Sequence, residues 1–538
     1  MSVGCITASA HLLHRPPPSR TRFLVTGCGV AATVGLLLGA TALAMAGGRS
    51  KELPLRLAFD SAAFFTYALP PIILDAGLRV DTRLFFHNIL RIFTLGVFVT
   101  VVCFAVTSAM VNVFLSAYDL PLRSQLAVGA VFGATDTVAT LAVLSERSAP
   151  RLFSIVLGEG CVNDAMSLVL LRAVESLPED GGTARDVLFL SLHFVWLFAA
   201  STILGMLVGL AAAAVAKLVS RPGPGQQASP VALEVALLFL WAYLAFLVAE
   251  VCRLSGILAL FAASLVMSHY ALRSISRGAH EATVASATTL ATVCEQLIFI
   301  STGMAVLDAR IWQQARAGEV LAITATLGTL LLLTRALAVF PALAAGNMLS
   351  RNTAREQISR ACACLAGAVL CLRLFVFVTV RESAVIWWAG STRGAVSIAI
   401  ATHHFAVAPP MARTDDPAKA ELQRSNASVI AAATLIVLTS SICFSGLTRP
   451  FLARVLPSAL AGAAEASAEL YSSLAEDEAP SPRSNWLFRA WDAVDRRYLA
   501  PVLGSEASEH ARLIHSGHTT ELLERGAAEG DDNGDGMS

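Results

Sequence analysis

Long apolar runs recur along the chain from about residue 24 to about residue 447, and many reach the roughly 18 residues that a membrane span requires. Their hydrophobicity is continuous rather than alternating, which is typical of helices and not of barrel strands. We therefore predict an all-α polytopic membrane protein with about twelve transmembrane helices. The predicted spans are residues 23–46, 54–76, 85–116, 122–145, 151–175, 187–218, 231–251, 254–272, 284–307, 318–349, 385–408 and 427–449.

Composition divides the chain into a basic N-terminal segment (residues 1–22), a transmembrane domain (23–450) and a cytosolic tail (451–538) with an acidic end that is expected to be disordered. The first apolar run ends at Ala44-Met45-Ala46, which resembles a signal-peptidase site. Its apolar part is about twice the usual length of a signal-peptide core, so a retained anchor is favoured over a cleaved signal. With both termini cytosolic, Lys and Arg are mildly enriched in the cytosolic loops, as the positive-inside rule expects.

The overall composition excludes several classes of function. Hydrophobic residues make up 55% of the chain, charged residues only 14%, and 39 basic side chains balance 39 acidic ones. Such a balance in a membrane protein gives no sign of nucleic-acid binding. The ten cysteines lie mostly in apolar runs without the spacing of a zinc site or a disulfide framework. No nucleophile, metalloprotease or P-loop motif is present, so neither an enzyme nor a resident cofactor is expected.

Five ionisable residues lie well inside predicted spans: Asp136, Glu159, Asp164, Glu295 and Arg335. Each would cost about 2.5–3.5 kcal/mol at the centre of a bilayer, so they should face one another, water or an ion. A functional role is favoured for Asp136 and Asp164 over an interfacial position. A structural ion pair is favoured for Glu159 and Arg335, and both interpretations stay open for Glu295.

The segment Gly158–Leu171 carries two of these acids on different helical faces. At 100° per residue, Asp164 shares a face with Gly160, whereas Glu159 shares one with Asn163, and the two polar stripes lie about 140° apart. One stripe can bind an ion while the other makes a structural pair. A carboxyl shielded from water can hold a proton or a hard cation, and hard cations take oxygen ligands.

Two other spans carry glycine and polar residues at their centres: Gly133–Leu144 and Trp387–Ala401. This pattern predicts helices interrupted in the middle of the bilayer, as in inverted-repeat transporters. Asp136 and Arg393 are placed to compensate the free backbone ends. The alternative for their glycines is tight helix–helix packing.

Several motifs in order resemble the electroneutral sodium/proton exchangers of the monovalent cation/proton antiporter superfamily. They are "LPPIILDAGLRVDTRLFFHNI" (69–89), "ATDTVATLAVL" (134–144), "GEGCVNDAMSLVL" (158–170), "LSGILALFAASLVMSHY" (254–270), "CEQLIFISTG" (294–303) and "AGSTRGAVSIAIA" (389–401). The resemblance implies an inverted-repeat antiporter fold with two crossing broken helices, a dimerisation domain and a core domain that moves like an elevator. It also implies a homodimer in the lipid bilayer.

The resemblance further implies roles for individual residues in exchanging cytosolic Na⁺ or K⁺ for H⁺. Asp164 would carry either the proton or the cation, and Asn163, where electrogenic relatives have a second aspartate, implies electroneutral exchange. Asp136 and Thr135 would shape the ion site. Glu159 would pair with Arg335.

The tail segment Asn485–Gly504 resembles the organellar, endosomal and Golgi exchangers, as does "SHY" at 268–270. This favours an endomembrane location and a role in pH and cation regulation, with the tail as a candidate site for regulatory partners. The alternative for the tail segment is an ordinary amphipathic interfacial helix.

Three departures from the family pattern leave a second function open. Thr137 replaces a proline, Gly160 replaces a serine on the Asp164 face, and about 25 residues are inserted near residues 355–380. The first two favour, as the alternative, a transport-inactive sensor or scaffold. The inserted stretch 361–380 is expected to lie at the cytosolic interface or to re-enter the membrane, because spanning would reverse the second crossing helix. A wrongly retained intron is the alternative for that stretch.

Overall fold

The computed structural model describes residues 27–45, 64–114, 121–144, 149–177, 184–220, 230–307, 309–358, 381–405 and 417–456, and the single residues 494, 497 and 499. Helices dominate this part of the chain and it contains no strand, as the sequence predicts. The predicted N-terminal segment (1–22), the inserted stretch (361–380) and nearly all of the tail lie outside the described residues.

Each predicted span corresponds to a helix or to an interrupted helix. In chain order, the α-helices are α2 (Gly27–Met45), α4 (Leu69–Arg79), α5 (Thr82–Phe93), α6 (Thr100–Phe114), α7 (Leu122–Val131), α8 (Val138–Leu141), α9 (Pro150–Glu175), α10 (Ala184–Ser220), α11 (Val231–Val251), α12 (Gly256–Val266), α13 (Leu272–Ser274), α14 (Arg277–Ala305), α15 (Ala309–Gln314), α16 (Ala317–Ile358), α18 (Ala395–His404), α19 (Pro417–Thr439) and α20 (Ser445–Val455). A further helix covers residues 381–389. Short π-helical turns lie at Phe64–Ala68, Thr94–Val99, Met267–Ala271 and Ser440–Phe444.

Nine helical segments among the described residues are long and apolar enough to cross a membrane. The two interrupted segments are not among the nine, because their halves are short. The predicted total of about twelve spans therefore remains a prediction. The last helix, α20, continues through Pro450 and so extends past the predicted end of the transmembrane domain.

Local sequence signals explain where several helices begin. α9 starts with Pro150, whose missing N–H costs no hydrogen bond in the first helical turn. The Ser255 and Ser276 side chains accept hydrogen bonds from the backbone N–H groups of Leu258 and Ala279, which caps α12 and α14.

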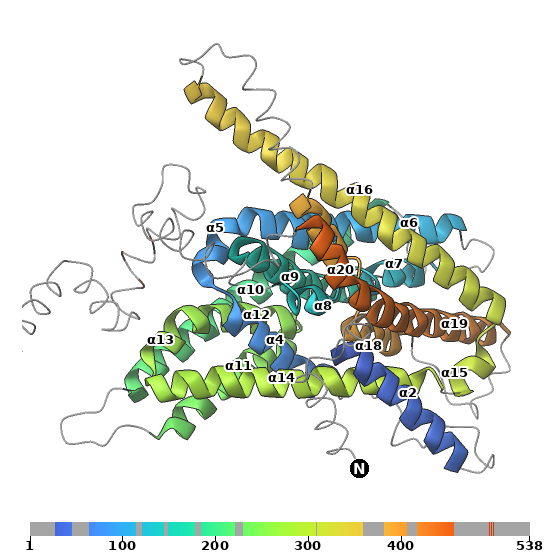
Figure 1. The fold of residues 1–538 in the computed structure, drawn as a ribbon, viewed down its shortest axis with the longest axis horizontal. Helices are drawn as coiled ribbons and strands as arrows, with labels where there is room; N and C mark the ends of the chain where they lie inside the picture. The colour runs from blue at the N-terminus through green and yellow to red at the C-terminus, as the bar shows by residue number, and fades with distance from the viewer. Residues whose placement is uncertain are drawn as a thin grey trace, which may run out of the picture.

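The helices form two groups that pack mainly within themselves (Figure 1). One group contains α2, α4, α10, α11, α12 and α14. The other contains α6, α7, α8, α9, α16, α18, α19 and α20. Helix α9 packs most extensively against α5 and α7 and also contacts α4, α10 and α12, so it lies where the two groups meet.

Helix α2, the first apolar run of the chain, packs along α14 at points where only glycine fits. A Cβ at Gly35 would overlap the carbonyl of Ile300, and a Cβ at Gly303 would overlap the carbonyl of Ala32. This close approach of two backbones is typical of helix packing in membranes. It makes α2 an integral part of the helical bundle.

The two interrupted helices lie side by side in the second group. The first consists of α7, a non-helical stretch at 132–137 and α8, and the second consists of the helix at 381–389, a break at 390–394 and α18. Their breaks contact each other directly: the N–H of Asp136 donates to the carbonyl of Thr392 over 3.0 Å, and the Thr392 hydroxyl donates to the carbonyl of Asp136.

Candidate cation-binding site

A cavity of about 370 Å³ lies between the two helix groups. Residues of α4 and α14 line one side of it. The first interrupted helix, α9 and the start of α18 line the other. Four carboxylates reach the cavity: Asp75, Asp136, Asp164 and Glu295. The cavity is therefore acidic and bounded by elements from both groups, which is the arrangement that a cation site at a moving interface would need.

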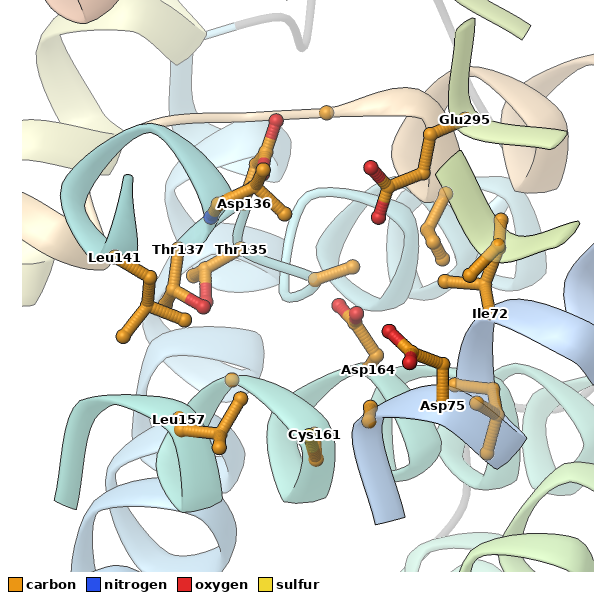
Figure 2. Close-up of a pocket in the computed structure, with 18 of the residues that line it drawn as sticks. Ile72, Asp75, Thr135, Asp136, Thr137, Leu141, Leu157, Cys161, Asp164 and Glu295 are labelled. Carbon is orange, nitrogen blue, oxygen red and sulfur yellow. The ribbon is translucent and has the colours of Figure 1, made fainter. Parts of the chain in front are cut away.

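The carboxylates differ in the directions they face (Figure 2). Asp75, Asp164 and Glu295 point toward one another across the cavity, whereas Asp136 points away from them. Asp136 instead accepts a hydrogen bond from the backbone N–H of Val138 over 3.1 Å, at the start of α8. Asp136 thus compensates a free N–H at the break.

Asp164 has no ion-pair partner among the described residues. Its Oδ1 atom is buried and makes no hydrogen bond with any described group, although the backbone N–H of Thr135 approaches the carboxylate. An ionised carboxylate in this position is costly unless a proton or a cation neutralises it. Asp164 is the acid of α9 with room beside it for such a partner.

Glu159, one and a half turns earlier on α9, lies in the opposite environment. Its Oε1 is 2.6 Å from Nη2 of Arg335 on α16, and the two side chains are 0% and 2% exposed. The Asn163 amide donates to the same Oε1 over 3.3 Å and to the Thr135 hydroxyl over 3.2 Å. These contacts join α9, α16 and the first break into one polar network.

Asn163 belongs to this network and not to the lining of the cavity formed by the described residues. Its oxygen accepts a hydrogen bond from Ser167 over 3.4 Å, so both ends of its amide are occupied. The structure therefore places Asn163 behind Thr135, where it orients a residue that does line the cavity.

Arg393 lies at the crossing and bonds to the carbonyl ends of both interrupted helices. Its Nε donates to the carbonyl of Phe132 over 3.0 Å, and its Nη1 donates to the carbonyls of Gly390 and Thr392 over 2.8 and 2.9 Å. The guanidinium charge offsets the negative end of each half-helix, as a cation at a helix C-terminus does. It also satisfies carbonyls that no water could reach.

Two glycines make the crossing possible. A Cβ at Gly390 would overlap the Arg335 guanidinium, and a Cβ at Gly394 would lie within 2.7 Å of the Asp136 carboxyl. The charges therefore occupy the space that a side chain at either position would need.

Asp75 of α4 lines the cavity although it was not among the predicted site residues. Its carboxylate is 2.8 Å from Nη2 of Arg79, one turn later on α4, and it accepts a hydrogen bond from Thr288 of α14 over 2.8 Å. The motif "LPPIILDAG" contains this aspartate and could have pointed to it. However, an aspartate followed four residues later by an arginine is also typical of the end of a membrane span. Glu295 of α14 lies beside this pair in the cavity and has no ion-pair partner among the described residues.

Comparisons with known proteins give a consistent result. The sequence matches the family described as "Sodium/hydrogen exchanger, transmembrane" over residues 21–454. It is 34% identical over 429 residues to sodium/hydrogen exchanger 4 of Arabidopsis thaliana, covering 79% of this chain and 74% of that protein. It is 35% identical over 431 residues to sodium/hydrogen exchanger 1 of Oryza sativa subsp. japonica, covering 79% and 73%. Human sodium/hydrogen exchanger 8 is 31% identical over 306 residues, covering 55% and 51%.

The fold is similar to that of a solved antiporter. The sodium proton antiporter MjNhaP1 from Methanocaldococcus jannaschii superposes with a TM-score of 0.53 at 15% sequence identity, covering 79% of this chain and 97% of that one. At this identity the match shows a shared fold, which is the predicted antiporter fold. The chain belongs to the sodium/hydrogen exchanger family, whose members are cation/proton antiporters and not enzymes.

Proposed function

We propose that the chain exchanges a monovalent cation, Na⁺ or K⁺, for H⁺ without net charge transfer, with Asp164 as the carrier of either ion. One observation supports this most directly. Asp164 presents its carboxylate to the cavity with no ion-pair partner among the described residues, whereas the neighbouring acid Glu159 is already neutralised by Arg335 and does not line the cavity. A single free carboxyl can hold a proton or a cation but not both.

The position of Asp164 connects this chemistry to movement. Asp164 belongs to the group of the interrupted helices, whereas Asp75 and Glu295 reach the cavity from the other group. With Asp164 neutralised, the group of the interrupted helices carries no uncompensated charge from this residue as it slides past the other group. With Asp164 ionised and empty, moving it through a low-dielectric barrier would cost several kcal/mol. Only the occupied states would therefore cross.

The other predicted residues then have supporting roles. Thr135 lines the cavity and is held by Asn163, while Asp136 and Arg393 compensate the ends of the interrupted helices. Glu159 and Arg335 fix α9 against α16. Because Asn163 is neutral, α9 offers one titratable carboxyl per transport cycle, which accounts for one-for-one exchange.

The proposal is tested in proteoliposomes that hold a pH gradient reported by an internal dye. Adding Na⁺ or K⁺ separately should dissipate the gradient with the wild type and not with Asp164→Asn. The matched control is Glu281→Gln, which removes an acid from the exposed part of α14 outside the cavity lining and should keep wild-type rates. An imposed membrane potential should leave the wild-type rate unchanged.

Two results would overturn the proposal. Full activity of Asp164→Asn would refute the carrier role. A folded wild type that gives no cation-dependent proton flux with either ion would instead support the transport-inactive sensor, the alternative raised by Thr137 and Gly160.

We further propose an endomembrane location with a role in organellar pH, on the basis of the tail segment 485–504 and the "SHY" sequence. We also propose a homodimer, which the family resemblance implies. Imaging of the tagged full chain with compartment markers tests the first, and cross-linking in native membranes tests the second. A plasma-membrane signal or a cross-linked profile that contains only monomer would contradict them.

A further inference from the structure

The first break meets α9 at Gly160, and it does so through Thr137. A Cβ placed at Gly160 would lie 3.0 Å from Cγ2 and 3.3 Å from Cβ of Thr137, with Oγ1 nearer still. The Thr137 side chain therefore occupies the space that any side chain at position 160 would need. The two residues form a matched pair across the contact between the break and α9.

The contact between Thr137 and Gly160 lies beside Asp164. Position 160 precedes Asp164 by four residues, so the two share one face of α9 one turn apart. Gly160, Thr137 and Asp164 all line the same cavity, in which Figure 2 shows Thr137 and Asp164. The Thr137 hydroxyl is thus held against the surface of α9 one turn from the carboxyl.

The Thr137 hydroxyl makes no hydrogen bond within the part of the chain that the structure describes. Thr137 stands at the N-cap of α8, where a threonine side chain usually accepts a backbone N–H bond, but its side chain makes none. Ser255 and Ser276, at the same position of α12 and α14, both make that bond. At α8 the Asp136 carboxylate accepts the N–H of Val138 instead. None of the described groups forms a hydrogen bond with the Thr137 hydroxyl.

We propose that Oγ1 of Thr137 is an oxygen ligand of the cation that binds at Asp164, and that Gly160 is required to let it reach that position. This inference rests on the proposed function and adds a residue that determines cation affinity. A desolvated Na⁺ or K⁺ needs several oxygen ligands, and a neutral hydroxyl supplies one without adding charge. The cation would then be held between the break and α9.

The first test removes only the hydroxyl. Thr137→Val keeps the branched shape and should raise the KM for the cation by about 5–10-fold, the usual cost of one lost polar contact, with a smaller change in the maximal rate. Thr137→Ser retains the hydroxyl and should keep a near-wild-type KM. Thr140→Val is the matched control on the same short helix, because Thr140 is buried and does not line the cavity.

The second test changes Gly160 and then moves the hydroxyl from position 137 to position 160. Gly160→Ala should lower the thermal unfolding midpoint, because its Cβ meets Thr137, and adding Thr137→Ala should restore the midpoint while leaving the cation KM raised. Thr137→Ala combined with Gly160→Ser should have a lower cation KM than Thr137→Ala alone, because it returns a hydroxyl to the same space.

The outcomes separate this inference from the proposed function. If the wild type exchanges cations and Thr137→Val keeps its KM, the ligand role is wrong and the carrier role stands. An equal rise in KM for Thr137→Ser, which keeps the hydroxyl, and for Thr137→Val, which lacks it, would show that the hydroxyl is not what sets the affinity and would also refute the ligand role. Unchanged stability in Gly160→Ala would refute the steric pairing.

Discussion

The two acids of α9 show how one helix can separate structure from transport. Glu159 and Asp164 are five residues apart and lie on different faces. Glu159 is 0% exposed and its Oε1 is bonded to Arg335 and Asn163, whereas Asp164 faces a cavity of about 370 Å³ and has no ion-pair partner among the described residues. The closed network fixes the helix in place, and the open face keeps one carboxyl available for an exchangeable ion.

Glu159 and Asp164 also differ in which helix group their neighbours belong to. On the Glu159 side, α9 is joined to α16 and to the first break, which are members of its own group. On the Asp164 side, the facing carboxylates belong to α4 and α14 of the other group, and Asp75 is already paired with Arg79. A sliding motion would change the surroundings of Asp164 and leave those of Glu159 intact.

The largest expected effect comes from breaking the closed network. Arg335→Met leaves the buried carboxylate of Glu159 without its cation and should lower the free energy of unfolding by about 3–5 kcal/mol. Adding Glu159→Met should recover much of that loss, because the pair is then replaced by apolar side chains. Thermal unfolding in detergent measures both variants. The same measurement on Asp164→Asn should show no loss of stability. An equal loss of stability for Arg335→Met and Asp164→Asn would contradict the separate roles of the two faces of α9.

A smaller effect is expected at the crossing of the interrupted helices. Arg393→Met removes the donors to the carbonyls of Phe132 and Gly390, whereas the carbonyl of Thr392 keeps the N–H of Asp136, and the free energy of unfolding should fall by about 1–3 kcal/mol. The maximal exchange rate should fall more than the affinity for the cation, because Arg393 holds the break and does not line the cavity. Kinetics in proteoliposomes over a range of Na⁺ concentrations separate the two. A pure change in KM would contradict this assignment.

The smallest effect is expected at Glu295, the acid that α14 contributes to the cavity. Glu295→Gln removes one negative charge from the side of the cavity formed by α14. The KM for the cation should rise about two- to fivefold, since exposed or partly solvated charges contribute roughly 1 kcal/mol or less to binding. The maximal rate should stay close to wild type. The effect should shrink at high ionic strength, because salt screens charges that act through a solvated cavity. Loss of exchange at all cation concentrations would make Glu295 a second carrier and contradict the account.

Much of the site could be predicted from sequence because charge inside a membrane is costly. That rule singled out Asp136, Glu159, Asp164, Glu295 and Arg335, and helical geometry alone placed Glu159 and Asp164 on separate faces. The glycines inside apolar runs indicated the two breaks. These inferences needed only the period of a helix and the low dielectric of lipid.

The rest could not be predicted because it depends on which segments meet. Asp75 drew no prediction from the sequence, because its place in the cavity depends on α14, which brings Thr288 and Glu295 to it. Thr137 and Gly160 looked like two separate departures from the family pattern, and only their contact across the break shows that they are coupled. Asn163 was grouped with the ion site, but its amide is bonded to Glu159 and Thr135 behind the cavity.

The central claim is that one carboxyl, Asp164, holds either a proton or a cation. Calorimetric titration of the purified protein with Na⁺ at a series of pH values, in buffers of different ionisation enthalpy, tests it most directly. The affinity for Na⁺ should weaken as pH falls, by up to about tenfold per pH unit where Asp164 is protonated, with about one proton released for each cation bound. A Na⁺ affinity that is the same at every pH, with no proton released, would contradict it.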